Sequence, residues 1–206
     1  MPRGAYLLTG PDGPYAVERF SCAPGPAGWR YVATRQDPDG RPLGRVDLVL
    51  DGAGRALRVQ VQAGGWQVRG GVVGDRCVWR RGEREHADRA AGFTGTSPGW
   101  LVATARLVAG RAPVRVRLVR LSDEALASRT VEQGWSAAGS RVEAGLPVEA
   151  YDVDELDTGE RRRLHLSGDV VVAAPGVALL ELDGPPTRTG TSTAGTSTAA
   201  RLGSPG

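Results

Sequence analysis

Hydrophobic and polar residues alternate along most of the chain, which is the pattern of half-buried β-strands. The clearest stretches are residues 45–51 (RVDLVLD), 57–62 (LRVQVQ) and 113–121 (PVRVRLVRL). In each stretch the apolar side chains fall on one face and the charged or amide side chains mostly on the other. The second stretch thus predicts Leu57, Val59 and Val61 on the buried face of a strand.

Glycine-rich turns separate these strands at short intervals. DPDGRP at 37–42 and DGAGR at 51–55 are examples, because Asp, Pro and Gly supply the backbone conformations that tight turns need. Evenly spaced short strands joined in this way predict one antiparallel sheet, and the many glycines indicate strong curvature. We therefore expect a mainly β fold: a single curved antiparallel sheet, a β-roll or half-barrel, packed on one or two short helices.

One stretch, residues 92–108 (GFTGTSPGWLVATARLV), stands out from the strands because it carries a helix start signal. Ser97 occupies the N-cap position and Pro98 the first helical position, where its missing N–H costs nothing. The apolar residues fit helical spacing, but they also alternate as in a strand. The capping signal favours a helix over 97–108. Residues 82–91, which are polar and charged, predict a loop or a short solvated helix.

The length of 206 residues is enough for one sizeable core. We expect a loose N-terminal lead over residues 1–14 and a single β-rich domain over 15–183. Beyond it, residues 184–206 are rich in Pro, Thr, Ser and Gly. Such a composition buries too little apolar area to offset the ordering entropy, so we expect a disordered tail.

Charge and cysteine content narrow the classes of function. All 26 basic residues are arginines, and most are interleaved with acids, so we expect no nucleic-acid partner. Two cysteines, Cys22 and Cys77, are too few for a disulfide scaffold and lack metal-binding spacing. With no signal peptide and no apolar run long enough for a transmembrane segment, we expect a soluble cytoplasmic protein without cofactor or metal. We expect it to be a monomer or a weak homo-oligomer.

No catalytic constellation is evident. His86 lies among Glu83, Glu85 and Asp88, which would suit an acid/base cluster but is also typical of a solvated charged loop. His165 alternates with leucines on a predicted strand and is expected on its polar face. We therefore assign no catalytic residue.

Aromatic residues on the predicted strands and helix offer a different kind of site. A sheet curved around a helix has a concave face, which large rings would either fill as core or line as a slot for an apolar ligand. Two charges are expected inside: Glu18 shares a strand face with Phe20, and Arg106 lies in the helical segment. A buried charge needs a partner or a polar ligand head. The predicted ligand-binding residues are Glu18, Trp66, Trp79, Trp100, Arg106 and Trp135.

Several short motifs occur along the chain in an order typical of one family. They are Glu18, residues 45–51, the Trp66 strand, Phe93-Thr94 with Thr96-Ser97-Pro98, Arg106-Leu107, Gln133-x-Trp135 and the closing DVVV and PGV at 169–177. In this order the chain resembles the bacterial family named for glycolipid binding. The resemblance implies a curved antiparallel β-roll related in shape to lipid-carrying half-barrels, and a lipid-like ligand.

Our leading hypothesis is a non-enzymatic binding module that holds a lipid-like or other amphiphilic small molecule in a concave, aromatic-lined face. One alternative is a small-molecule enzyme that uses Glu18, His86 or Arg106 as acid/base or anion-orienting groups. Another is a structural protein whose strand at 113–121 pairs with a partner chain at an exposed edge.

Overall fold

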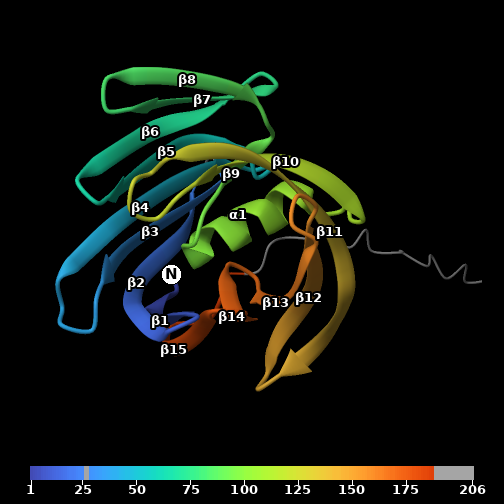
Figure 1. The fold of residues 1–206 in the computed structure, drawn as a ribbon. Helices are drawn as coiled ribbons and strands as arrows, with labels where there is room; N and C mark the ends of the chain where they lie inside the picture. The colour runs from blue at the N-terminus through green and yellow to red at the C-terminus, as the bar shows by residue number, and fades with distance from the viewer. Residues whose placement is uncertain (26–27, 188–206) are drawn as a thin grey trace, which may run out of the picture.

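A single 15-stranded sheet curves around one helix in the computed structural model, which describes residues 1–25 and 28–187 (Figure 1). The helix is α1 (Pro98–Val108). The strands are β1 (Arg3–Gly10), β2 (Gly13–Gly25), β3 (Gly28–Gln36), β4 (Pro42–Asp51), β5 (Ala56–Ala63), β6 (Trp66–Val73), β7 (Arg76–Arg81), β8 (Arg84–Arg89), β9 (Gly92–Thr94), β10 (Val114–Leu121), β11 (Ser128–Glu143), β12 (Leu146–Glu155), β13 (Glu160–Ser167), β14 (Val170–Ala174) and β15 (Val177–Asp183).

Most neighbours in the sheet are also neighbours in the sequence. The order runs from β8 down to β1, continues through β15, and then descends from β14 to β9. β1 pairs with β15 and joins the two halves of the sheet, so β8 and β9 form its two edges. The pairing of β9 with β10 is parallel. A parallel pair needs a crossover connection, and α1 is that connection.

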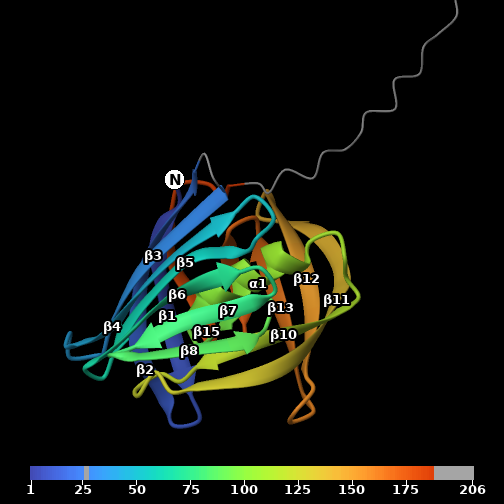
Figure 2. The same cartoon turned by 90° about the horizontal axis from the view of Figure 1, so that it is seen from above.

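The helix occupies the inner side of the curved sheet (Figures 1 and 2). Every residue of α1 is buried except Arg106. Gly99 lies so close to Tyr31 that an added Cβ would be 2.4 Å from a ring carbon. The predictions of a mainly β, curved single sheet and of a helix over 97–108 are thus confirmed. The concave side of the sheet is filled by α1.

The expected loose lead over residues 1–14 is wrong, because residues 3–10 form β1 in the middle of the sheet. Tyr6 and Leu8 are each 1 % exposed. The partner of this strand on one side, β15, is distant in the sequence, so no local pattern reveals the pairing. Residues 184–187 form no strand; the rest of the predicted tail, 188–206, lies outside the described residues.

Two local predictions also need correction. Residues 84–89, expected as loop or helix, form β8, an exposed edge strand whose charged side chains discourage pairing with other chains. Leu57 is 52 % exposed rather than buried. The register shifts here: Val49 pairs with Arg58 but Leu50 with Ala56, so Leu57 is the extra residue of a bulge.

Within residues 1–25 and 28–187, no helix is long and apolar enough to cross a membrane.

Candidate functional site

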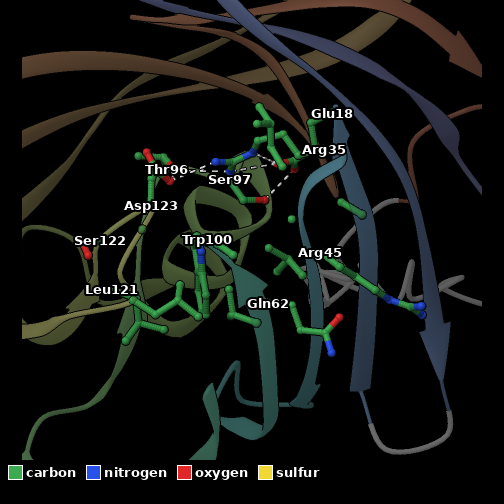
Figure 3. A pocket seen from close by; sticks show the side chains of 18 residues that line it. Glu18, Arg35, Arg45, Gln62, Thr96, Ser97, Trp100, Leu121, Ser122 and Asp123 are labelled. Atoms are coloured by element: carbon green, nitrogen blue, oxygen red, sulfur yellow. Dashed lines mark hydrogen bonds and ion pairs between the residues drawn. The ribbon is translucent and has the colours of Figure 1, made fainter. Parts of the chain in front are cut away.

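A buried cluster of polar side chains lies at the N-terminal end of α1 (Figure 3). Its centre is Glu18 on β2, which is 1 % exposed. The Oε1 atom accepts hydrogen bonds from Tyr31 Oη at 2.7 Å and Ser97 Oγ at 2.6 Å. The Oε2 atom accepts from Nε and Nη2 of Arg35 at 3.3 Å and 3.1 Å. The buried carboxylate is therefore paired with a cation and fully hydrogen-bonded, as buried charges must be.

Ser97 precedes the helix as predicted, but its side chain does not cap it. The hydroxyl donates to Glu18 instead, while the backbone carbonyl of Ser97 accepts from the N–H of Trp100 at 3.0 Å. A negative charge near the start of a helix is stabilised by the helix dipole. Glu18 thus fixes the start of α1 against β2 and β3.

A second layer connects this cluster to the surface. Arg35 donates through Nη1 to Asp123 at 2.9 Å and through Nη2 to Thr96 at 3.2 Å, and Thr96 donates to Asp123. The cavity beside these residues has a volume of about 30 Å³, which holds a water molecule or two but no organic ligand. Burial, with the Glu18 carboxylate, raises the pKa of Tyr31 well above its usual value, so Tyr31 stays a hydrogen-bond donor.

A row of stacked aromatic rings leads from the Glu18 cluster toward the other end of α1. Tyr6 stacks on Phe20 at 4.5 Å between centroids, Phe20 on Tyr31 at 5.9 Å, and Tyr31 on Trp29 at 5.7 Å. The Cζ atom of Arg106 lies 5.5 Å from the centroid of Trp29, within the range of a cation–π interaction. Arg106 therefore marks the far end of this row.

The surroundings of Arg106 differ from those of Glu18 because hydrogen-bond partners are missing. In the described part of the chain, no hydrogen bond or ion pair involves the Arg106 guanidinium, and Nε1 of Trp29 and Oδ2 of Asp169 are buried without a partner. Oδ1 of Asp169 accepts from the backbone N–H of Thr187 at 2.7 Å. Burial lowers the pKa of Arg106, and the charge of Asp169 partly offsets this.

Two clefts meet at Arg106, and Ala109 lines both. The first, about 730 Å³, has five charged residues in its wall: Arg55, Asp75, Arg89, Arg106 and Arg111. Four guanidinium groups thus face one carboxylate. The second, about 360 Å³, is lined mainly by small or apolar residues, among them Ala105, Ala137, Ala150, Tyr151 and Leu166. A cationic cleft therefore adjoins a mainly apolar one, with Arg106 at the junction.

Most of the cationic groups in the first cleft are already engaged. Arg55 donates to the carbonyl of Gly74 at 2.8 Å, Arg111 donates to the carbonyl of Leu107, and Arg89 lies 3.6 Å from Asp75. Arg106 is the arginine of this cleft whose donors are free of any acceptor in the described structure. It is the group best placed to bind an incoming anion.

The predicted ligand-binding residues do not gather around one cavity. Trp79, Trp100 and Trp135 are buried in the core at 8 %, 4 % and 2 % exposure. Trp66 is 44 % exposed, and the guanidinium carbon of Arg81 lies 3.6 Å from its ring centroid. Glu18 and Arg106 lie near opposite ends of α1.

The remaining sequence candidates are scattered. His86 lies exposed on β8, with its ring stacked on Trp79 at 5.4 Å. Burial raises the pKa of Cys77 to about 12 and that of Cys22 still further, so both thiols stay protonated. Among the residues that the structure describes, no group of three His, Cys, Asp or Glu side chains is arranged to hold a metal ion.

Sequence reasoning missed Arg35, Tyr31 and Asp169. Arg35 pairs directly with Glu18 across β2 and β3, so an exact hairpin register would have found it. Asp169 gives no such signal, because its neighbourhood is assembled from segments far apart in the sequence.

The fold and the clefts define the chain as a single-sheet β-roll protein wrapped around a helix. No family model matches the sequence, and no match was found among curated proteins. The crystal structure of a DUF1089 family protein from Pseudomonas aeruginosa is similar, with 18 % sequence identity and a TM-score of 0.42. The match covers 84 % of this chain and 90 % of that chain.

Proposed function

We propose that the protein is a non-enzymatic binding module for an amphiphilic small molecule with an anionic head group. The ligand occupies the two clefts at the C-terminal end of α1. The head lies in the cationic cleft, the apolar body lies in the alanine-lined cleft, and Arg106 contacts the head where the clefts meet.

The observation that carries this proposal is the partner-free guanidinium of Arg106. A half-buried arginine over the face of Trp29, with no hydrogen-bond acceptor in the described structure, is desolvated at a cost that the charge of Asp169 offsets only in part. A phosphate or carboxylate would offset it, because charge-assisted hydrogen bonds to guanidinium are among the strongest in proteins. Arg35 differs from Arg106 in this respect, because each of its three nitrogens donates to a protein acceptor: Glu18, Asp123 or Thr96.

The proposed location differs from the concave face expected from the sequence, because α1 fills that face. The polar ends expected there are also separated: Glu18 has its hydrogen-bond partners, whereas Arg106 has none among the described residues. A glycolipid with an acidic head group belongs to the proposed ligand class, in keeping with the sequence resemblance.

The enzyme hypothesis gains no support from the geometry. Neither cleft that Arg106 lines includes Glu18 or His86. Acid/base chemistry would need at least two of these groups within reach of one reacting atom.

The proposal can be tested by isothermal titration calorimetry below the critical micelle concentration. The probes are dodecyl phosphate, dodecyl maltoside and inorganic phosphate. We expect dodecyl phosphate to bind about tenfold or more tightly than either of the others, because only it supplies both the anion and the chain. Arg106→Gln should weaken its binding by about tenfold or more.

Arg115→Gln is the matched control, because Arg115 lies exposed on β10 and lines neither cleft. It should bind dodecyl phosphate as the wild type does. Equal binding by Arg106→Gln and the wild type, or equal binding of dodecyl phosphate and dodecyl maltoside, would overturn the proposal.

A further inference from the structure

The outer face of β4, β5 and β6, opposite α1, carries a compact grid of polar side chains. In one row across the strands Arg45 pairs with Gln62, which pairs with Gln67. In the next row Asp47 pairs with Gln60, which pairs with Arg69. These six residues line a groove of about 270 Å³, which we call the outer-face groove. No apolar side chain lines it.

The carboxylate in this groove is already committed to other partners. Asp47 is only 6 % exposed and accepts two hydrogen bonds from Arg30, at 3.1 Å and 2.7 Å, and one from Arg58 at 3.4 Å. Burial by itself would raise the pKa of Asp47, but the two guanidinium groups outweigh it and lower that pKa. Asp47 therefore does not neutralise the other arginines of the groove.

Those other arginines, Arg45 and Arg69, are exposed. In the described part of the chain neither makes a hydrogen bond to an acceptor or an ion pair. The side chains of Arg45 and Gln62 extend away from the Glu18 cluster (Figure 3). Two free cations thus border three amides, each of which can both donate and accept hydrogen bonds.

A second cleft adjoins the outer-face groove at the ends of these strands. A neighbouring cleft of about 600 Å³ shares Arg45, Gln62 and Gln67 with the outer-face groove and is also lined by Trp66. Trp66 precedes Gln67 on β6, so its ring points to the other face of the sheet, where Arg81 stacks on it.

We propose that the outer-face groove binds a small polyhydroxylated anion, namely a sugar that carries a phosphate or a carboxylate. The glutamine amides donate to and accept from vicinal hydroxyl groups. The guanidinium groups of Arg45 and Arg69 bind the anionic substituent, because their planar donors match phosphate and carboxylate oxygens.

This site is separate from the proposed amphiphile site. The outer-face groove lies on the opposite side of the sheet from α1, and it shares no lining residue with the clefts at Arg106. A positive or negative result for ligand binding at the outer-face groove therefore does not affect the amphiphile proposal.

The test is a titration of the full chain, observed by NMR at the side-chain amides of glutamine and the Nε–H groups of arginine. The probes are glucose 6-phosphate, glucuronate, glucose and inorganic phosphate. We expect the first two to bind at least about fivefold more tightly than glucose or phosphate, because each combines hydroxyls with an anion. The stronger of the two identifies the anionic group that the site prefers.

Arg45→Gln and Arg69→Gln should each weaken binding about fivefold or more, whereas Arg115→Gln should not. All three residues are exposed, so thermal unfolding should show that the variants fold alike. Equal affinity for phosphate and glucose 6-phosphate would reduce the groove to a general anion patch and overturn the proposal. An absence of shifts at the glutamine amides, or displacement of the sugar by a lower concentration of oligouridylate, would also overturn it.

Discussion

The Cζ atom of Arg106 lies 5.5 Å from the ring centroid of Trp29, and neither residue has a side-chain hydrogen-bond partner in the described structure. The ring stacked on Trp29, that of Tyr31, belongs to the Glu18 cluster, where its hydroxyl donates to Glu18 at 2.7 Å and the hydrogen bonds of the carboxylate are complete. The two ends of α1 thus carry charges of opposite sign that complement the helix dipole. Among residues 1–25 and 28–187, the charge at the C-terminal end is the one of the two that lacks a hydrogen-bond partner.

Removing the charge of Arg106 should therefore leave the fold intact. We expect Arg106→Met to change the free energy of unfolding by no more than about 1 kcal/mol, in either direction, because the relieved desolvation of the guanidinium and the lost attraction to Asp169 oppose each other. Arg35→Met should cost about 3 kcal/mol, because it leaves Glu18 buried without its cation. Urea denaturation of the two variants makes the comparison. An equal loss of stability in both would assign Arg106 a structural role.

Tyr31 should contribute a single hydrogen bond to the Glu18 cluster. Tyr31→Phe keeps the ring stacked between Phe20 and Trp29 but removes the donor to Glu18. Since Ser97 and Arg35 still hold the carboxylate, we expect a loss of about 1–2 kcal/mol in the free energy of unfolding. Ser97→Ala removes the other hydroxyl group that donates to the same Glu18 oxygen, and we expect a similar loss. A loss near zero in both variants would mean that Glu18 does not depend on these donors.

The contact between α1 and β3 depends on the absence of a side chain at position 99. A Cβ on Gly99 would lie 2.4 Å from a Tyr31 ring carbon, so Gly99→Ala must displace the ring or the helix. We expect a cost of about 1–3 kcal/mol, although alanine is the better helix former. Gly52→Ala is the control, because no atom lies within 4 Å of its added Cβ. A cooperative thermal melt of each variant gives the difference, and equal melting temperatures would show that α1 packs less closely than described.

Acid should weaken the fold through Asp47. Its pKa in the unfolded chain is near 3.8, and the folded value lies lower because Arg30 and Arg58 outweigh the effect of burial. A group whose pKa is lowered on folding contributes its stability above the unfolded value and loses it as the pH falls through the folded value. The difference in unfolding free energy between the wild type and Asp47→Asn should therefore be constant from pH 7 to about pH 5 and shrink below pH 4. Urea titrations across this range measure it, and a difference independent of pH would contradict the assignment.

The sequence predicted the parts of this molecule that depend on local pattern. Alternation placed Glu18 on the buried face with Phe20, and Ser97 with Pro98 marked the start of α1. The hydrogen bond that Ser97 makes was not predictable, because Glu18 lies on a strand distant in the sequence. The filling of the concave face was not predictable either. It follows from the closeness of Gly99 to Tyr31, which depends on how tightly the sheet curves.

The junction of the two clefts offers a way to block binding without touching Arg106. Ala109 is exposed and lines both clefts, so Ala109→Trp should fill the junction with an indole while leaving the core unchanged. We expect dodecyl phosphate binding to fall by about tenfold or more, because the apolar chain can no longer pass Arg106. The free energy of unfolding should change by only about 0.5 kcal/mol. Ala87→Trp on the edge strand β8, also exposed and outside both clefts, should bind normally. Undiminished binding by Ala109→Trp would place the ligand elsewhere on the molecule, even if Arg106 proved necessary.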